Sequence, residues 1–332
     1  MVSQSPEVDF QVTFQGNNPR IHLPVRLSVL EAVSFRDVGQ KLVALNPTPE
    51  KIILDFEKTS FIDSSGIGAL INNLKTADAS GVKLILENVG PQVMSVFALT
   101  DLNQVLTIKN TIDSVNSTET RGDNAHLPVT HPSVRSWVKR LIDIVGAIVG
   151  LSITGVLAIP ISIAIVLDSK GPIFFGQTRC GWMGRRFRMW KFRSMIPDAE
   201  ARKHEVENQA EGAIFKNDRD PRITNVGRFL RRTSLDELPQ FWNVLKGDMS
   251  LVGTRPPTPD EVAIYEIPQW QRLDVKPGMT GEWQVNGRSQ VKNFEDIIRL
   301  DLQYQENWSL MYDMKLIFKT IMVLFQKSSG AM

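Results

Sequence analysis

Cysteine is almost absent from this sequence of 332 residues, in which Cys180 is the only one. A single thiol excludes an internal disulfide framework and is typical of proteins of the reducing cytoplasm. The first residues also lack a basic stretch followed by an apolar core, so no signal peptide is predicted. Internal repeats and long low-complexity tracts are missing too, which argues against a repeat protein.

Neither sign of charge dominates the composition. The net charge is +2, and the hydrophobic share of 42% and the charged share of 22% are ordinary for a globular protein. The length is sufficient for two domains. The total charge therefore says little about partners, and the local distribution of basic residues has to be considered instead.

The N-terminal part alternates between strand and helix patterns. Strands are predicted at Val8–Phe14, Ile52–Phe56 and Val82–Leu86, and apolar residues have helical spacing in Leu30–Leu45 and Ile67–Ala79. Such alternation is typical of a small α/β domain in which the helices pack on one side of a single sheet.

A hydroxyl-rich turn opens the second of these helices. Asp63 and Ser64 follow a strand and its loop. The Ser64 hydroxyl at a helix start fits two roles, an ordinary cap of the helix or the carrier of a phosphate. The residues alone favour the cap.

A resemblance to the STAS domain, the fold of the anti-sigma-factor antagonists, is carried by DFEKTSFIDSSGIGALI and the later GVKLILENVGPQVMSVFALTDLNQVLTI. The resemblance covers residues 1–112 and implies a regulatory or docking module with a protein partner. It also implies that Ser64, directly after the aspartate, is a phosphorylation site whose charge switches the module.

A change in composition marks the end of this domain. Residues 113–136 are rich in Ser, Thr, Asn, Asp and Pro and lack apolar periodicity, which predicts a flexible linker. Residues 137–332 would then form the second domain.

The second domain starts with the most apolar stretch of the chain. Ile144–Leu167 has 24 residues without a charge, more than the roughly 20 that a membrane-crossing helix needs. A plain span would separate the N-terminal domain from the C-terminal part, whereas Pro160 breaks the hydrogen-bond ladder of a helix in mid-segment. A re-entrant helix–break–helix over residues 141–167 is therefore predicted, with Lys139 and Arg140 at the anionic cytoplasmic surface.

Basic residues interleave with aromatic ones after the apolar stretch. Arg179–Arg193 holds six basic residues and no acidic one, with Trp and Phe between them. Such a run fits single-stranded nucleic acid, which uses cations and stacking rings, or a membrane interface. The apolar segment directly before it favours the membrane, so no nucleic-acid partner is expected.

A pair of carboxylates follows a second basic cluster. Asp236 and Glu237 lie where a helix is predicted to begin, just after Arg231 and Arg232. Either Asp236 caps this helix, or Ser234 and Glu237 form a capping box. Capping alone would explain the carboxylates, but the converging arginines favour a site that binds a pyrophosphate.

Two faces are expected on the helix that follows. An apolar stripe at helical spacing is predicted to be buried, and its members are Leu235, Leu238, Trp242 and Leu245. A different face is predicted to look into the site, with Asp236, Gln240 and Asn243.

Three segments of the second domain resemble the bacterial sugar transferases that start exopolysaccharide and O-antigen assembly, which are monotopic phosphoglycosyl transferases. The segments are DSKGPIFFGQTRCGWMGRRFRMWKFRSM, DPRITNVGRFLRRTSLDELPQFWNVLKGDMSLVGTRPP and KPGMTGEWQVNGR. The resemblance implies a mainly helical, membrane-associated catalytic domain at the cytoplasmic face of the bacterial inner membrane. It implies transfer of a sugar 1-phosphate from a UDP-sugar to undecaprenyl phosphate, a polyprenyl phosphate, with release of UMP and with Mg²⁺ as cofactor.

The resemblance also assigns roles to individual residues. Asp236 would attack the sugar-bearing phosphorus and form a phosphosugar-aspartate, since a carboxylate can serve as nucleophile and leave again. Glu237 would hold Mg²⁺ together with Asp236, or hold the incoming phosphate. The residues implied to bind the substrate are Lys191 and Arg231 near the phosphates and Arg255 and Pro256 near the nucleotide.

The sequence departs from the family pattern at two places. Ile159 precedes Pro160 where the family often has serine, and one turn reads Gly253-Thr254-Arg255-Pro256 where Gly-Pro-Arg-Pro is common. Neither departure touches the carboxylate pair. The alternative function is an inactive membrane signalling scaffold that acts through its STAS domain and Ser64. The sugar, and whether the protein is a homo-oligomer, are left open by the sequence.

A short apolar helix is predicted at the end of the chain. Asp313–Phe325 is too short to span a membrane. It belongs either to the core or to the membrane interface, and the interface is preferred.

Overall fold

The computed structural model describes residues 9–109, 130–209, 217, 219–287 and 293–325, and it divides into two compact units. Of the described residues, those of 9–130, 183–185 and 266–274 form the first unit, and those of 131–182, 186–265 and 275–325 form the second. The short stretch 266–274 thus packs with the N-terminal unit, although it lies within the predicted second domain.

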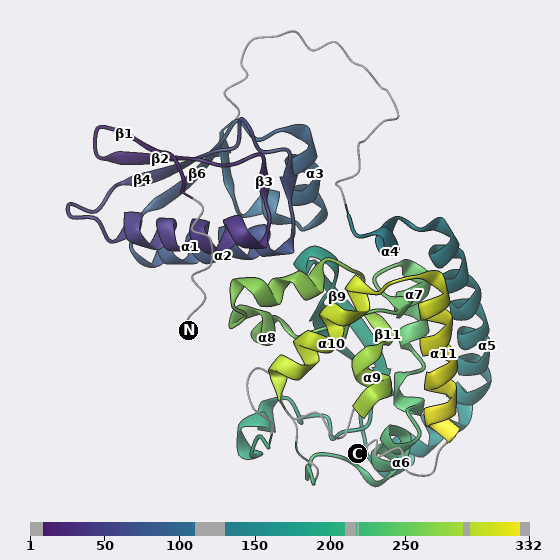
Figure 1. The fold of residues 1–332 in the computed structure, drawn as a ribbon. Helices are drawn as coiled ribbons and strands as arrows, with labels where there is room; N and C mark the ends of the chain where they lie inside the picture. Colours follow the sequence, from purple (N-terminus) through teal and green to yellow (C-terminus); the bar gives the residue numbers. More distant parts are fainter. Residues whose placement is uncertain (1–8, 110–129, 210–216, 218, 288–292, 326–332) are drawn as a thin grey trace, which may run out of the picture. The chain divides into compact units, whose positions relative to one another are not determined.

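A five-stranded sheet forms the centre of the first unit (Figure 1). Its first two strands are antiparallel, and the remaining neighbours are parallel. The strands, in spatial order, are β1 (Val12–Gln15), β2 (Asn18–His22), β4 (Lys51–Asp55), β6 (Lys83–Glu87) and β7 (Thr107–Lys109). The central strands are nearly continuous apolar runs, as parallel strands buried on both faces require.

Helices α1 (Val29–Val43) and α2 (Ser64–Ala79) lie side by side on one face of this sheet (Figure 1). The unit is completed by α3 (Pro91–Leu99), η1 (Leu102–Gln104) and a parallel pair of short strands, β3 (Arg26–Leu27) and β5 (Phe61–Ile62). The predicted α/β domain with helices on one side of a sheet is confirmed.

The second unit is mainly helical, as the sequence predicted. Its helices are α4 (Pro132–Arg135), α5 (Trp137–Asp168), α6 (Asn225–Arg232), α7 (Gln240–Lys246), α8 (Pro259–Ala263), α9 (Glu282–Gly287), α10 (Phe294–Glu306) and α11 (Leu310–Phe325), with the 3₁₀ turns η3 (Ala201–Glu205) and η4 (Leu235–Glu237). Its strands are the antiparallel hairpin β8 (Phe174–Cys180) and β9 (Arg186–Phe192) and the parallel pair β10 (Ser250–Val252) and β11 (Gly278–Thr280). Of the predicted linker 113–136, residues 113–129 lie outside the described residues, and the described remainder contains α4.

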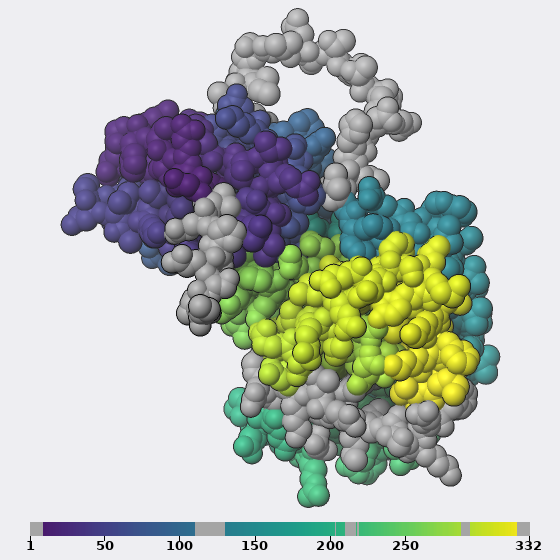
Figure 2. Space-filling model, in the orientation of Figure 1, coloured from purple at the N-terminus to yellow at the C-terminus, as the bar shows by residue number. Residues whose placement is uncertain are grey.

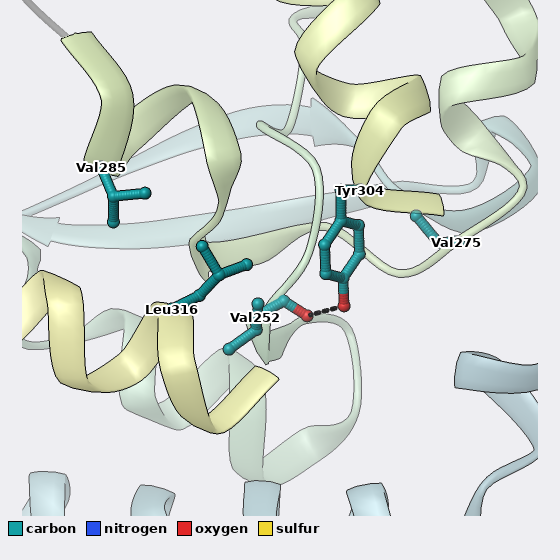
Figure 3. Close-up of a cluster of buried hydrophobic side chains, with 5 residues drawn as sticks. All are labelled: Val252, Val275, Val285, Tyr304 and Leu316. Atoms are coloured by element: carbon teal, nitrogen blue, oxygen red, sulfur yellow. Dashed lines mark hydrogen bonds between the residues drawn. The ribbon is translucent and has the colours of Figure 1, made fainter. Parts of the chain in front are cut away.

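The C-terminal helices close one core of the second unit. Figure 3 shows Tyr304 of α10 and Leu316 of α11 around Val252, whose carbonyl accepts a hydrogen bond from the Tyr304 hydroxyl at 3.2 Å. The side chains of these two helices form a continuous surface in Figure 2. On α11 the outward residues include Met311, Met314, Phe318, Ile321 and Met322. The helix therefore contributes to the core and also exposes an apolar face.

Helix α5 runs from Trp137 to Asp168 without interruption, and Pro160 lies inside it. The predicted helix–break–helix is thus not what the structure has. The reason is tertiary packing on both sides of the proline: Gly150 lies against the Phe241 ring, and Ile165 packs with Phe192 and Leu230. This packing compensates for the hydrogen bond that a proline cannot donate.

One face of α5 is packed and the other is open. The buried residues recur at helical spacing and so lie on one face, and they are Lys139, Asp143, Ala147, Gly150, Thr154, Ile161 and Ile165. The open face is apolar along the helix, with Leu141, Val145, Ile148, Val149, Ile153, Val156, Ile159, Ile163, Val166 and Leu167. By length and composition alone, α5 is the one helix of the described chain that could cross a membrane.

The two basic residues at the start of α5 do not lie at a free surface, so that part of the prediction is wrong. Lys139 is 6% exposed, and its Nζ donates to Asp313 Oδ2 at 2.5 Å and to the Val252 carbonyl at 3.0 Å. Arg140 donates to the carbonyls of Val244 and Leu245 at the end of α7, at 2.7 and 2.6 Å. Both cations hold the second unit together, because buried carbonyl and carboxylate oxygens need donors.

Two glycines of α5 provide a matched test of this packing. A Cβ at Gly150 would lie 2.4 Å from the Phe241 ring, whereas one at Gly155 would meet no described atom within 4 Å. We expect Gly150→Ala to lower the melting temperature, because overpacking costs about 1–3 kcal/mol against the roughly 1 kcal/mol gained by replacing a helical glycine. Gly155→Ala should leave the melting temperature unchanged or raise it, and equal losses in both proteins would show that α5 does not pack through Gly150.

Candidate active site

The carboxylate pair lies in a 3₁₀ turn rather than at the start of the helix. Asp236 and Glu237 belong to η4, which Ser234 precedes with a left-handed backbone (φ 57°). Helix α7 begins only at Gln240, with Pro239 as its N-cap. Both capping alternatives are therefore wrong, because neither carboxylate caps α7 and Ser234 makes no side-chain cap bond. Proline, which has no backbone donor to lose, takes the capping position.

Lys191 of β9 reaches the carboxylate pair. Its Nζ donates to Glu237 Oε1 at 3.0 Å, and both side chains are partly exposed, at 25% and 16%. Asp236 is 6% exposed, so the neighbouring carboxylate is more deeply enclosed. The ion pair orients Glu237 and brings a cation to the turn that carries Asp236.

Asn243 holds β9 in place for this contact. It is fully buried, its Oδ1 accepts from the Trp190 backbone N–H at 3.1 Å, and its Nδ2 donates to the Arg188 carbonyl at 2.8 Å. The prediction that Asn243 looks into the site is wrong, because its amide is used up in joining α7 to β9. Of the predicted buried stripe, Trp242 is 49% exposed, whereas Leu235, Leu238 and Leu245 are partly buried against the core.

Arg231 comes from the end of α6. Its Nε donates to Ser194 Oγ at 2.9 Å, just beyond β9. Helix α6 can approach this strand end because Gly227 lies against the Ser194 carbonyl, where a Cβ would come within 1.9 Å. Since η4 packs against both α6 and β9, the structure brings together four of the predicted residues, namely Lys191, Arg231, Asp236 and Glu237.

A second cationic cluster surrounds the turn that contains Arg255. Its guanidinium makes two bonds to Glu261, at 2.7 and 3.0 Å, and lies 5.8 Å from the Trp283 ring centre. Arg179 Nη1 donates to the Pro256 carbonyl at 2.9 Å. The predicted Arg255 and Pro256 are thus held by residues that the sequence did not single out.

Electrostatics connects the two clusters. Burial first, and then the nearby charge of Arg255, lowers the pKa of Arg179 to about 10, while Glu261 and Glu237 act in the opposite direction. Burial raises the pKa of Glu261, but Arg255, Arg179 and the Thr258 backbone N–H together outweigh it and keep the pKa below its usual value. Arg179 and Arg255 carry like charges and share the ionised Glu261 carboxylate, and these two cations favour an anionic ligand beside them.

Three residues of this cluster were not predicted as site residues, and the sequence indicates some of them better than others. Arg179 belongs to the basic run, and Glu261 completes a capping box with Thr258 that is visible in the sequence. Trp283 carries no such signal, because a lone tryptophan in a helix is usually a core residue.

The donor set suits Mg²⁺ only together with a substrate. Among the described residues no group of three or more His, Cys, Asp and Glu side chains could hold a metal. Asp236 and Glu237 supply two carboxylates, and Mg²⁺ in phosphoryl-transfer sites is typically held by one or two carboxylates plus substrate phosphates and waters. The residues therefore fit a metal that arrives with a diphosphate.

Two predicted residues lie outside this site. Pro160 is in α5, and Ser64 is the first residue of α2 in the first unit, where it is fully buried. The Ser64 phosphorylation site stays a prediction.

Comparisons with known proteins agree with both resemblances. Residues 134–327 match the family described as bacterial sugar transferase, and residues 11–115 match the STAS domain. Galactosyl transferase CpsE of Streptococcus agalactiae is 53% identical over 188 residues, 56% of this chain and 42% of that protein.

Two further relatives differ in how much of their length is covered. Undecaprenyl-phosphate galactose phosphotransferase of Salmonella typhimurium is 43% identical over 200 residues, 58% of this chain and 42% of the relative. Exopolysaccharide production protein ExoY of Rhizobium meliloti is 37% identical over 194 residues, 57% of this chain and 85% of the relative. This chain thus spans less than half the length of the first two relatives and most of the third.

Proposed function

Because the chain belongs to the bacterial sugar transferase family, we propose that it moves a sugar 1-phosphate from a UDP-sugar to undecaprenyl phosphate and releases UMP. The reaction would be the initiating step of exopolysaccharide or related glycan synthesis. The observation that supports this most directly is the enclosed Asp236 in the same 3₁₀ turn as Glu237, which forms an ion pair with Lys191. This turn packs against α6, the helix that carries Arg231.

The chemistry divides into two displacements. In the first, an Asp236 oxygen forms a bond to the sugar-bearing phosphorus of the UDP-sugar, and the bond to the UMP oxygen breaks, so that UMP leaves. In the second, an oxygen of undecaprenyl phosphate attacks the same phosphorus, and the acyl phosphate bond to Asp236 breaks. The product is a sugar on a lipid diphosphate, and Asp236 is regenerated as a carboxylate.

The other residues of the site position the substrate and neutralise the charge of its phosphates. Lys191 and Arg231 balance charge on the phosphate oxygens, which is most of what phosphoryl transfer requires from a protein. Arg255, oriented by Glu261, and Arg179, which fixes the Pro256 carbonyl, would hold the nucleotide end. Asp236 and Glu237 would hold the Mg²⁺ that arrives with the diphosphate, and this metal would supply further charge neutralisation.

The apolar face of α5 supports a place at the cytoplasmic face of the bacterial inner membrane. Its opposite face is packed against the second unit near both ends of the helix, at Lys139 and at Ile165. A helix bound along its length cannot leave its domain to cross a bilayer alone, whereas an open apolar stripe can lie in the interface. A monotopic arrangement is the placement that this packing favours.

Membrane association gives a direct test of that stripe. Val156 and Ile159 are 76% and 69% exposed on α5. We expect Val156→Glu with Ile159→Glu to shift most of the protein from the membrane fraction to the soluble fraction, because each carboxylate costs several kcal/mol in hydrocarbon. Gln303→Glu, an added charge on the exposed side of α10, is the control and should stay in the membrane fraction. Retention of the double variant would contradict the placement.

Turnover tests the reaction itself. Protein in nanodiscs with Mg²⁺ and undecaprenyl phosphate should release UMP with one or two members of a panel of UDP-sugars. The sugar accepted would also name the donor. No release with any sugar would favour the inactive signalling scaffold.

A further inference from the structure

A short segment of the later chain forms part of the first unit. Residues Glu266–Asp274, with the 3₁₀ helix η5 (Ile267–Leu273), pack against α1 and α2. Ile267 and Leu273 are 1% exposed and Arg272 is fully buried. Burial of this extent shows that the segment is an integral layer of the unit.

One contact is polar and sits at the start of α2. The Asp274 carboxylate accepts a hydrogen bond from the Ser64 backbone N–H at 3.0 Å, and a second from the Ser64 hydroxyl. A carboxylate is favoured there because the first amides of a helix lack partners and the helix dipole is positive. The Ser64 hydroxyl is consequently engaged and shielded from solvent.

The second contact is apolar and depends on a missing side chain. The Trp270 ring lies over Gly68, where a Cβ would come within 2.6 Å of the ring, and it also lies near Gly184, at 3.2 Å. Gly68 is a poor choice for the middle of a helix, so its presence in α2 fits the need to admit this ring.

A second carboxylate, that of Asp63, lies close to the polar contact and repels Asp274. Asp63, whose carboxylate caps α2 through Gly66, is buried beside Asp274. Burial first, and then the charge of Asp274, raises the pKa of Asp63 to about 7. Two buried carboxylates at one helix start repel each other, so an added negative charge acts on a contact that is already strained electrostatically.

We propose that the surface formed by Ser64 and Gly68 on α2 is a docking surface, and that its occupant is the chain's own segment Glu266–Asp274, held by the Asp274–Ser64 contact and released by a negative charge at position 64. Any external partner of this surface would have to displace the segment. The proposal stands apart from the transferase chemistry, since none of these residues belongs to the candidate active site.

The segment Glu266–Asp274 is joined at both ends to residues of the second unit. The segment is continuous at one end with Tyr265, which packs on Phe294, and at the other with Val275, which is buried with Val252 and Tyr304. The segment of the first unit is therefore continuous at both of its ends with the chain of the second unit.

Hydrogen exchange of the full-length protein tests the proposal. In Ser64→Asp we expect the amides of 267–273 to exchange about tenfold faster or more, which corresponds to roughly 1.4 kcal/mol of lost docking. Ser64→Asn introduces a side chain of the same size as aspartate but without its charge. In this variant the amides of 267–273 should exchange at a rate within about threefold of the wild type. Adding Asp274→Asn to Ser64→Asp should restore most of the protection, because the repulsion is removed and an acceptor oxygen remains.

A variant without a charge change keeps the test independent of electrostatics. Gly68→Ala should also expose 267–273, although alanine normally stabilises a helix. Exchange in β4 and β6 serves as the folding control, and it should be unchanged because an aspartate in the first turn favours α2 itself. Equal exchange of 267–273 in Ser64→Asp and Ser64→Asn, or full protection in Gly68→Ala, would overturn the proposal.

Docking should also depend on pH. Asp63 is faced by Asp274 from the segment and by Glu31 from α1. Because docking raises the pKa of Asp63 from its ordinary value of 3.8 to about 7, the docked state holds an extra proton between these values. Protection of 267–273 should therefore be highest near pH 4, fall as the pH rises to about 7, and stay level above that. Asp63→Asn, which still caps α2, should flatten this dependence once intrinsic exchange rates are corrected. An unchanged dependence in that variant would assign it to another group.

Discussion

The Asp236→Asn protein is expected to release no measurable UMP from any UDP-sugar, a loss on the order of 10⁴-fold or more in turnover. Asparagine preserves the size of the side chain in an environment that is only 6% exposed, so the fold should survive. Its amide oxygen cannot displace UMP, because no carboxylate is present to form the acyl phosphate. The loss is expected in kcat, since the proposed substrate-binding residues Lys191, Arg231 and Arg255 are unchanged.

The covalent intermediate can be tested separately from turnover. Incubated with the accepted UDP-sugar and without undecaprenyl phosphate, the wild-type protein should gain the mass of one sugar phosphate, and Asp236→Asn should gain none. Glu237→Gln is the matched control, because it neutralises the adjacent carboxylate and weakens the 3.0 Å contact to Lys191 without removing the nucleophile. It should lose about 10²-fold in rate and still form the adduct. An adduct in Asp236→Asn but not in Glu237→Gln would reverse the two roles.

The N-terminal domain could be predicted because its pattern is local. The strand β4 and helices α1 and α2 follow directly from apolar runs and spacing. The strand β2 was missed, since Pro19 and Arg20 in its short sequence conceal a strand that only its neighbours β1 and β4 reveal. The segment Glu266–Asp274 could not be assigned to this unit, because long-range packing has no periodicity in the sequence.

The 3₁₀ turn of the candidate active site could be predicted only in part from the sequence. The apolar spacing of Leu235, Leu238 and Leu245 continues across η4 and into α7, so one uninterrupted helix was expected where the structure has a 3₁₀ turn followed by a helix. Pro239 was the available signal, because proline is favoured near a helix start. The residue types of the site were nevertheless recognisable, since carboxylates and cations converge within one short stretch.

The long apolar helix was recognised, but its neighbours were not. Hydropathy measures each residue alone, and it therefore hid the small and polar face of α5 formed by Asp143, Gly150 and Thr154. Asp143 accepts from Ser250 Oγ and the Leu251 backbone N–H, both at 2.9 Å, which fixes β10 to this helix. Charged residues at the edge of an apolar stretch can serve the protein interior as well as the lipid headgroups.

The Lys139→Met protein is expected to lose about 3–5 kcal/mol of unfolding free energy, because removing one partner of a buried ion pair leaves the other charge uncompensated. Both side chains are at most 7% exposed, and Asp313 also accepts from the Tyr304 hydroxyl at 2.8 Å and from Trp308 Nε1 at 3.2 Å. Those two neutral donors remain in the variant, but they cannot balance a carboxylate charge. Denaturant unfolding in detergent measures the loss.

A double variant and a surface control decide how that loss is interpreted. Lys139→Met with Asp313→Leu should recover much of the stability, since an apolar pair replaces both charges and the Tyr304 hydroxyl still reaches the Val252 carbonyl at 3.2 Å. Arg135→Met removes a cation from an exposed position four residues earlier and should change stability by less than about 0.5 kcal/mol. If Lys139→Met behaved like Arg135→Met, the Lys139 charge would have to be solvated in the folded protein, and the start of α5 would lie at the membrane surface after all. If instead the double variant were as unstable as the single one, the hydrogen bond from Lys139 to Val252 would be the contact that matters.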